Sequence, residues 1–201
     1  YAQNSFTLKS SSKSFNLAAH RTAYFYSDNR AYVDKVLKGG HQRFLLNVMG
    51  LIASNVALKH GDNYIDEQNA YLTENTKYVA KYCADKIPLI KYKPHEGTYL
   101  AWLDCRGLYE KLDAVNKAKK ITDYNTKNNI TETDFLGVTV IKAYSPGRIV
   151  KEWVMDNARV DINGGNDYGS GGEGFMRMNL ATNRAMITKA LNNIEAAINA
   201  L

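Results

Sequence analysis

Residues 10–21 of this 201-residue chain read SSSKSFNLAAHR and follow an alternating run at residues 5–10 that is typical of a short β-strand. Lys13 lies in the serine-rich turn, three residues after Ser10 and eight residues before Arg21. A lysine amine can condense with an aldehyde, and a serine hydroxyl and a guanidinium together can hold a phosphate group. A solvated lysine in a polar turn would look the same, so these residues alone leave both interpretations open.

Beyond this turn, segments with strand and helix periodicity follow one another along the chain. The predicted strands are residues 22–26, 89–92, 98–104, 137–143 and 175–180, with 89–92 and 98–104 paired through a turn. The predicted helices are residues 30–37, 43–59, 63–86, 109–120, 148–158 and 183–201, with a polar stretch at 123–133 and a glycine-rich loop at 164–174. This alternation predicts an α/β or α+β architecture with a domain boundary near residues 86–90.

The apolar pattern of the helices makes further predictions. The helix at 43–59 is apolar on nearly every side, which predicts burial on most sides, and Gly50 in its middle predicts close packing there. The helix at 63–86 is amphipathic, and its apolar stripe places Cys83 in the core. Thr182 is positioned to cap the last helix, whose apolar positions extend to Leu201.

Composition and charge restrict the classes of function. The formal net charge is +6 with a pI of about 9.1, but the basic cluster Lys117, Lys119 and Lys120 lacks interleaved aromatic residues. A solvated helix face is therefore favoured over a nucleic-acid site. No run reaches the length of a membrane span, so we expect no membrane partner. The two cysteines and four histidines are not spaced as in a disulfide framework or a metal site, which predicts no metal and a reduced, cytoplasmic setting.

A second group of residues lies near the end of the chain, where residues 171–181 read GGEGFMRMNLA. An arginine on a strand after a glycine loop, here Arg177, can bind a carboxylate with two parallel hydrogen bonds. An arginine paired with a surface carboxylate would give the same pattern. The loop lacks the order of glycines that binds a dinucleotide between a strand and a helix, so a nicotinamide site is not expected.

Three motifs occur in an order that resembles a known family. Residues 12–18 (SKSFNLA), 95–104 (HEGTYLAWLD) and 172–181 (GEGFMRMNLA) resemble the fold-type-I aminotransferases of class I and II, which depend on pyridoxal 5′-phosphate (PLP). Residues 60–67 (HGDNYIDE) are most similar to the cystathionine β-lyase, or C–S lyase, branch, which includes the maltose-regulon modulator. The resemblance covers nearly the whole chain.

The resemblance assigns roles to individual residues. It implies that Lys13 forms the Schiff base with PLP, that Ser10 and Arg21 bind the phosphate of PLP, and that Arg177 binds the α-carboxylate of the substrate. The fold it implies is α/β, with residues 1–87 forming the C-terminal portion of the PLP-binding large domain. Residues 88–201 would form an α+β small domain with a long insertion around 106–160.

Family members are much longer chains, so the resemblance implies that these residues are the C-terminal half of an enzyme. The phosphate-binding loop, the aromatic residue that stacks on the ring and the aspartate that pairs the pyridine nitrogen would then lie outside this chain. We therefore expect these 201 residues alone not to turn over substrate. Uncovered helix faces and sheet edges in residues 1–86 predict self-association, as in the homodimers of the family.

Three functions stay open at this level. The first is C–S β-elimination from an L-amino acid such as cystathionine or cysteine, and the second is transamination, which begins with the same removal of the α-proton by Lys13. The third is a regulatory protein that keeps the fold and binds a partner without catalysis, with residues 106–160 as the first place to look. Retention of both Lys13 and Arg177 favours catalysis.

Overall fold

The computed structural model describes residues 4–40, 46–134 and 136–201, and the chain divides into two compact units, Tyr1–Ala70 and Tyr71–Leu201. The first unit contains β1 (Thr7–Lys9), the 3₁₀ helix η2 (Ala18–His20), β2 (Tyr24–Tyr26), α1 (Arg30–Gly39), α2 (Val48–His60) and the start of α3 (Asp62–Lys86). Helix α3 continues into the second unit, so the boundary between the units falls within this helix.

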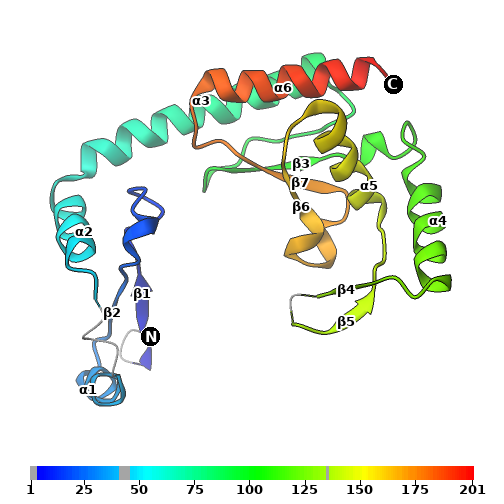
Figure 1. The fold of residues 1–201 in the computed structure, drawn as a ribbon. Coiled ribbons are helices and arrows are strands. Elements are labelled where there is room, and N and C mark those ends of the chain that lie inside the picture. The colour runs from blue at the N-terminus through cyan, green and yellow to red at the C-terminus, as the bar shows by residue number, and fades with distance from the viewer. Residues whose placement is uncertain (1–3, 41–45, 135) are drawn as a thin grey trace. The chain divides into compact units, whose positions relative to one another are not determined.

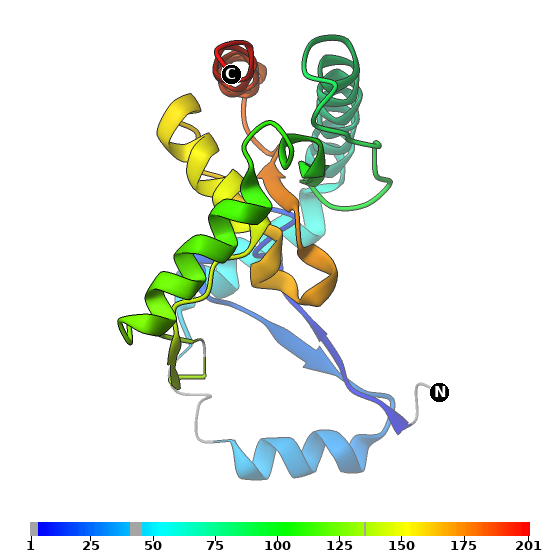
Figure 2. The ribbon, with the colours of Figure 1, turned by 90° about the vertical axis from the view of Figure 1, so that its right-hand side faces the viewer.

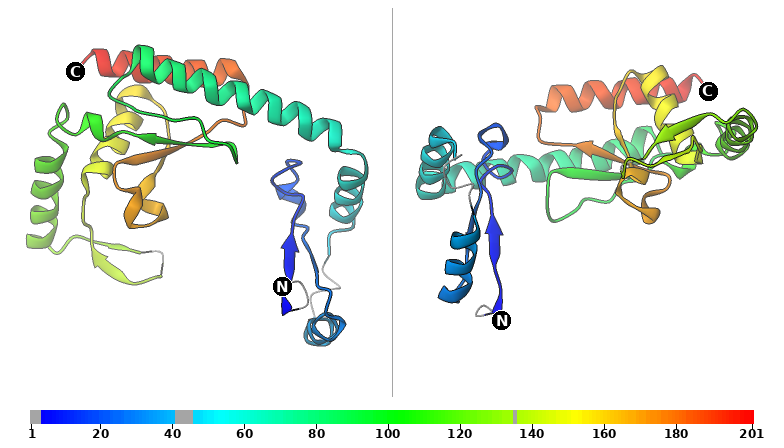
Figure 3. Two further views of the ribbon diagram at one scale, coloured as in Figure 1. Left: turned by 180° about the vertical axis from the view of Figure 1, so that it is seen from behind. Right: turned by 60° about the horizontal axis from the view of Figure 1, so that its bottom comes forward.

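In the first unit, β1 and β2 form an antiparallel pair in which Thr7 lies opposite Tyr26 and Lys9 opposite Tyr24. Figure 3 shows this pair with α2 beside it and α1 at one end. The strands predicted at 5–10 and 22–26 are confirmed. Helix α1 begins where the Asn29 side chain accepts a hydrogen bond from the backbone N–H of Ala31, an N-cap that fits the helix predicted from residue 30.

Helix α2 has its apolar side chains in solvent, so the prediction of burial on most sides was wrong. Val48 is 65% exposed, Met49 63% and Ile52 54%, and the buried residues of α2 are Gly50 and Ser54. The predicted residues 43–45 lie outside the described part of the chain. The physical reason for the exposure is that the described residues 4–70 bury only small or polar side chains and supply no apolar layer for α2 to pack against.

The second unit holds a three-stranded sheet with helices on one side. Its elements after α3 are β3 (Leu100–Asp104), η4 (Arg106–Leu108), α4 (Ala114–Lys127), β4 (Thr131–Thr133), β5 (Thr139–Ile141), α5 (Pro146–Trp153), the π-helical turn η5 (Val154–Ala158), β6 (Asn163–Gly164), η6 (Gly165–Tyr168), η7 (Ser170–Gly172), β7 (Phe175–Asn179) and α6 (Arg184–Asn199). The sheet order is β3-β7-β6, with both neighbours antiparallel to β7. Figure 1 shows α3 and α6 running along the same side of this sheet.

The hydrophobic core of the chain lies in this second unit. Alternate residues of the central strands point inward, namely Ala101 and Leu103 of β3 and Met176 and Met178 of β7, and all four are buried. They pack in one cluster with buried apolar residues of the flanking helices, including Val79, Cys83, Ile87, Val150, Val154, Ile187, Leu191 and Ile194. The strand predicted at 175–180, the apolar stripe of residues 63–86 and the core position of Cys83 are confirmed.

Several predicted elements differ from the structure in the second unit. Residues 89–92 pair with the predicted partner strand, but through a single antiparallel bridge between Lys91 and Asp104, on the side of β3 that faces away from β7. The helix predicted at 109–120 begins at Ala114 and extends into the predicted polar stretch at 123–133, where α4 ends at Lys127. Helix α4 lies against α5, as Figure 2 shows, and this packing stabilises a helix whose sequence is rich in polar residues.

The sequence analysis also missed two short strands and placed one helix cap at the wrong residue. Strand β4 pairs with β5 in a hairpin, and β6 pairs with β7, although the sequence of neither β4 nor β6 has a strand pattern. The last helix is capped by Asn183, whose side chain accepts a hydrogen bond from Met186 N–H at 2.8 Å, and Thr182 is not the cap. Leu201 is exposed beyond the end of α6. Within the described residues, no helix is both long enough and apolar enough to cross a lipid bilayer.

One buried amide joins α3 to the segment between β7 and α6. The side chain of Asn75 is fully buried, and its Nδ2 donates to the carbonyl oxygens of Leu180 at 2.9 Å and Thr182 at 3.4 Å. Its Oδ1 accepts a hydrogen bond from Arg184 Nε at 2.7 Å. Because all three partners lose their hydrogen bonds when the amide is removed, this residue contributes more than its size suggests.

We predict that Asn75→Ala lowers the free energy of unfolding of the second unit by about 2–3 kcal/mol, because it leaves a guanidinium and two carbonyl groups without a partner. Urea unfolding followed by circular dichroism measures this change. Asn199→Ala, at an exposed position of α6, is the control and should change stability by less than about 0.5 kcal/mol. Equal effects of the two substitutions would contradict the prediction.

Candidate functional site

Lys13 lies in a compact turn between β1 and η2. The backbone N–H of Phe15 donates to the carbonyl of Ser11 at 3.0 Å, and the N–H of Leu17 donates to the carbonyl of Ser12 at 3.0 Å. These two hydrogen bonds fold residues 11–17 back on themselves and leave the Lys13 side chain exposed. The turn therefore presents an accessible primary amine on a backbone that is held in place.

Ser10 and Arg21 meet at the same end of the β1–β2 pair. Ser10 Oγ donates to the carbonyl oxygen of Thr22 at 2.8 Å, and Thr22 follows Arg21 directly in the chain. The same hydroxyl accepts the backbone N–H of Ser12 at 3.1 Å and lies 2.6 Å from Ser12 Oγ. Within the described residues, neither Lys13 nor Arg21 forms an ion pair. Two uncompensated cations and a pair of hydroxyls thus share one short segment, which suits an anionic ligand.

Helix α2 packs against this segment through small and polar residues. The hydroxyls of Ser11 and Ser54 are hydrogen-bonded to each other at 2.7 Å, and both residues are buried. A Cβ atom on Gly50 would lie 2.1 Å from Thr22 Oγ1 and 2.8 Å from the carbonyl oxygen of His20. The close packing predicted at Gly50 is therefore confirmed, and α2 holds the backbone on both sides of Lys13 and Arg21.

Arg177 occupies the middle of β7, on the face of the sheet opposite to the core. It lies across from Trp102 of β3, and its Nη2 donates to Asn163 Oδ1 at 3.1 Å. The guanidinium carbon is 4.4 Å from the centre of the Tyr168 ring. Arg177 Nε is buried, and the described part of the chain offers it no hydrogen-bond partner. Arg177 also lines a cavity of about 400 Å³, and its Nε is a buried donor without an acceptor among the described residues.

The carboxylate of Glu173 ties the glycine-rich loop to its surroundings. Glu173 Oε1 accepts hydrogen bonds from Tyr109 Oη at 2.7 Å and from the backbone N–H of Gly147 at 2.6 Å, and Oε2 accepts one from the Asn166 amide. Burial acts to raise the pKa of Glu173, but these hydrogen bonds outweigh it and hold the pKa below its ordinary value. Burial and the nearby carboxylate together raise the pKa of Tyr109. Glu173 is therefore an ionised anchor for the loop.

Other reactive side chains do not form a site. Both cysteines are buried and free, and burial raises the pKa of Cys83 to about 11, so its thiol is protonated and inert near neutral pH. Among the described residues, no group of three or more His, Cys, Asp or Glu side chains could hold a metal ion. The candidates that remain among the described residues are the predicted ones, Lys13 with Ser10 and Arg21 in the first unit and Arg177 in the second.

The sequence did not reveal every residue that shapes these sites. Ser54 carries no signal of its own, since its role depends on the contact with Ser11, 43 positions earlier. Tyr168 had a weak signal as an aromatic residue within a glycine-rich loop, and Asn163 had none. Trp102 lies in a recognisable strand, but only the strand register places it opposite Arg177.

The chain belongs to the aminotransferase class I and II family, because the model of that family matches residues 2–194. Among curated relatives, a Mycobacterium tuberculosis protein named "Putative cystathionine beta-lyase" is 30% identical over 198 residues, covering 98% of this chain and 44% of that protein. The protein MalY of Escherichia coli is 27% identical over 197 residues, covering 96% of this chain and 42% of that protein. The chain thus spans less than half of the length of these relatives.

Solved structures of the same fold extend this comparison. Cystalysin from Treponema denticola, which contains PLP, superposes with a TM-score of 0.72 at 20% identity, covering 99% of this chain and 42% of cystalysin. A PLP-bound C–S lyase from Staphylococcus hominis superposes with a TM-score of 0.68 at 24% identity, covering 96% of this chain and 42% of that lyase. The likeness confirms the predicted α/β fold of the PLP-dependent transferases.

We predict that Gly50→Ala loosens the contact between α2 and the segment that carries Lys13, because the new methyl group would overlap Thr22 Oγ1 and the His20 carbonyl. Amide hydrogen exchange in α2 and around Thr22 should become about ten-fold faster or more, as expected for a local loss of about 1–3 kcal/mol. The control is Gly39→Ala, where a Cβ has nothing within 4 Å. Unchanged exchange in Gly50→Ala would show that the contact is not as tight as described.

Proposed function

We propose that this chain is part of a PLP-dependent C–S β-lyase that acts on L-amino acids of the cystathionine or cysteine type. The observation that carries the proposal is the exposed amine of Lys13 in a held turn, beside an uncompensated Arg21 and the hydroxyl of Ser10. Curated relatives named as cystathionine β-lyases and the shared fold of PLP-bound C–S lyases support it. As the chain spans less than half of those relatives, the activity is proposed for a longer protein that contains these residues.

The residues of the first unit fit the cofactor. Ser10 and Arg21 would bind the phosphate through a hydroxyl and a guanidinium, with the Ser10 hydroxyl turning its proton from the Thr22 carbonyl to the phosphate. Lys13 would hold the aldehyde end through its Nζ. When bound, PLP supplies an electron sink for the bonds at the substrate α-carbon. The Ser11–Ser54 hydrogen bond would keep the lysine turn fixed against α2 during the reaction.

Lys13 and Arg177 would have different roles toward the substrate. Lys13 Nζ, as a free amine, would take the proton from the α-carbon, the step that β-elimination and transamination share. Arg177 would bind the α-carboxylate through N–H groups of its guanidinium. A leaving group on the β-carbon would then direct the reaction to elimination.

Transamination is the second candidate, and the family description itself favours it. The two reactions use Lys13 and Arg177 in the same way and differ at the β-carbon, so the residues of this chain do not discriminate between them. The regulatory alternative receives less support, because a module that only binds a partner needs neither a reactive amine at Lys13 nor a buried Arg177 Nε that lacks an acceptor among the described residues.

The domain organisation and assembly belong to the same proposal. Residues 1–87 would be the C-terminal portion of a large PLP-binding domain and residues 88–201 the small domain, with residues 106–160 as an insertion. The exposed apolar residues of α2 support a homo-oligomer, and an apolar cavity of about 570 Å³ between this helix and the lysine turn adds to that surface. A cytoplasmic location fits the free cysteines.

We predict that the purified chain self-associates and that Ile52→Lys shifts it to a smaller species, because a charge on the exposed apolar face of α2 opposes burial of that face. Sedimentation velocity measures the distribution of species. The matched control is Leu136→Lys, which places the same charge on an exposed leucine of the second unit. A monomeric wild-type chain, or an equal shift in both variants, would count against the proposed interface.

We predict that PLP, followed by borohydride reduction, labels Lys13 in preference to the other lysines, because Ser10 and Arg21 hold the phosphate beside this amine. Mass spectrometry of peptides locates the label, which should be lost in Lys13→Ala and kept in Lys9→Ala, a neighbouring exposed lysine of β1. Labelling of Lys13 no stronger than that of α4 lysines would refute the proposed cofactor site.

Pyruvate release from cystathionine by this chain with added PLP should stay at background.

A further inference from the structure

The glycine-rich loop, which has no part in the proposed function, carries an aromatic residue in contact with Arg177. Tyr168, at the end of η6, stacks on the guanidinium of Arg177 with 4.4 Å between the guanidinium carbon and the ring centre. A cation above an aromatic face is attracted by the negative charge of that face. The contact covers one face of the guanidinium and does not use its N–H donors, which lie in the plane of the group.

Of two N–H donors of the Arg177 guanidinium, one has a hydrogen-bond partner and the other has none among the described residues. Nη2 donates to Asn163 Oδ1 at 3.1 Å, and Nε is buried with no acceptor within the described residues. A guanidinium that lacked a contact on its face could rotate about its side-chain bonds and turn these donors toward solvent. Tyr168 and Asn163 together oppose this rotation, since one contacts the plane and the other fixes a corner of it.

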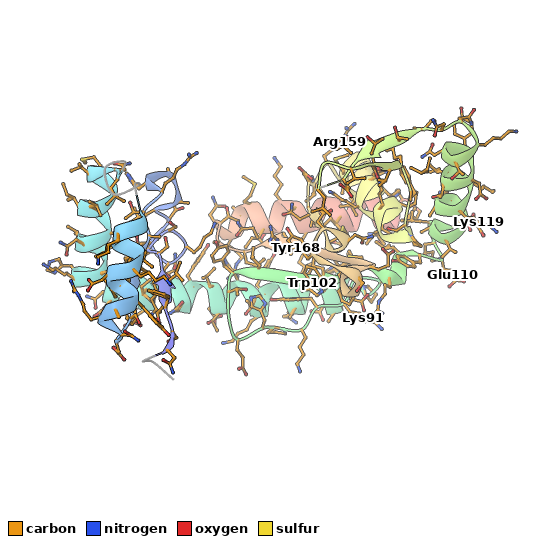
Figure 4. All side chains as sticks on the ribbon, turned by 90° about the horizontal axis from the view of Figure 1, so that it is seen from below. Lys91, Trp102, Glu110, Lys119, Arg159 and Tyr168 are labelled. Atoms are coloured by element: carbon orange, nitrogen blue, oxygen red, sulfur yellow. The ribbon has the colours of Figure 1, made fainter. Side chains whose placement is uncertain are left out.

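Tyr168 is itself held by a row of aromatic rings along β3 and β7. Its ring meets Trp102 edge-on at 5.8 Å between centroids, and Trp102 stacks on Phe175 at 5.7 Å with 14° between the ring planes. The guanidinium of Arg106 lies 5.0 Å from the centre of the Phe175 ring and closes the row at its other end. Trp102 and Tyr168 are labelled in Figure 4, where they lie next to each other on the sheet.

The loop that carries Tyr168 is rigid for a steric reason. A Cβ on Gly172 would lie 1.9 Å from the carbonyl oxygen of Gly165, and a Cβ on Gly165 would lie 2.2 Å from that of Gly172. Only glycine permits this approach, which closes the loop on itself. Asn166, inside the closed loop, donates to Ser145 Oγ at 2.8 Å and to Glu173. The backbone before and after Tyr168 is therefore held from several directions.

We propose that Tyr168 is the positioning residue of the carboxylate site, stacking on Arg177 so that the guanidinium plane is held in one orientation for the incoming carboxylate. This inference rests on the proposed role of Arg177 and adds the residue that sets its orientation. The ring, and not the hydroxyl, performs this role, because the described residues give the Tyr168 hydroxyl no hydrogen bond while the ring contacts both Arg177 and Trp102. Tyr168 is 47% exposed, so its free surface also forms a wall beside the ligand.

The test observes the Arg177 Nε–H group directly by ¹⁵N NMR of the 201-residue chain, with the signal identified by its loss in Arg177→Lys. Without ligand, relaxation of this signal should report a rigid guanidinium in the wild type and in Tyr168→Phe, and a mobile one in Tyr168→Ala. In a titration with sodium acetate, against sodium chloride at equal ionic strength, Tyr168→Ala should bind about five- to ten-fold more weakly. Tyr168→Phe should bind as the wild type does.

The results distinguish the positioning role of Tyr168 from the role of Arg177 as the carboxylate ligand. Tyr124→Ala, an exposed tyrosine of α4, is the control for a general effect of ring removal and should change neither measurement. A Tyr168→Ala chain with an equally rigid guanidinium and unchanged acetate affinity would overturn the positioning role while leaving Arg177 as the carboxylate ligand. A wild-type chain whose Arg177 signal does not respond to acetate would overturn the proposed role of Arg177, and the relaxation data would then decide the stacking contact alone.

Discussion

The antiparallel pairing of β3 with β7 is the constraint on which the second unit depends. Because successive side chains of a strand point to opposite faces, one register puts Leu103 and Met176 into the core and Trp102 and Arg177 on the opposite face. A shift by one residue would exchange the two sets and bury the guanidinium. The core that stabilises the sheet and the site that would bind a carboxylate are thus fixed by the same hydrogen bonds.

The first unit depends on a different kind of contact. Its buried side chains are small or polar, and the Ser11–Ser54 hydrogen bond and the close approach at Gly50 join α2 to the segment of Lys13. Such contacts orient a turn well, but they remove little apolar surface from water and therefore contribute little to stability. Helix α2 exposes a large apolar surface, and exposure of such a surface to water is unfavourable. We therefore propose that further polypeptide covers it.

The sequence predicted elements best where the structure depends on neighbours in the chain. The strands of the β1–β2 pair, α3 and β7 were found, because their apolar periodicity is local and strong. Strand β6 was missed, because it is defined by pairing with β7, and the pairing predicted for residues 89–92 is limited to one bridge between Lys91 and Asp104. Helix α2 was expected to be buried because its sequence is apolar. Hydropathy indicates that burial would stabilise such a helix, but it does not show whether other described residues cover it.

The candidate sites divide in the same way. By itself the sequence indicated the family, which the family model confirms, and through that resemblance it nominated Lys13, Ser10, Arg21 and Arg177 as candidate site residues, because the resemblance depends on short motifs that are local in the chain. Only the tertiary structure decided that Tyr168 covers the face of Arg177 and that the Nε of this arginine has no partner among the described residues. Both facts depend on contacts between segments, and the spacing of residues in the sequence does not reveal which segments meet. Such contacts are set by the fold as a whole.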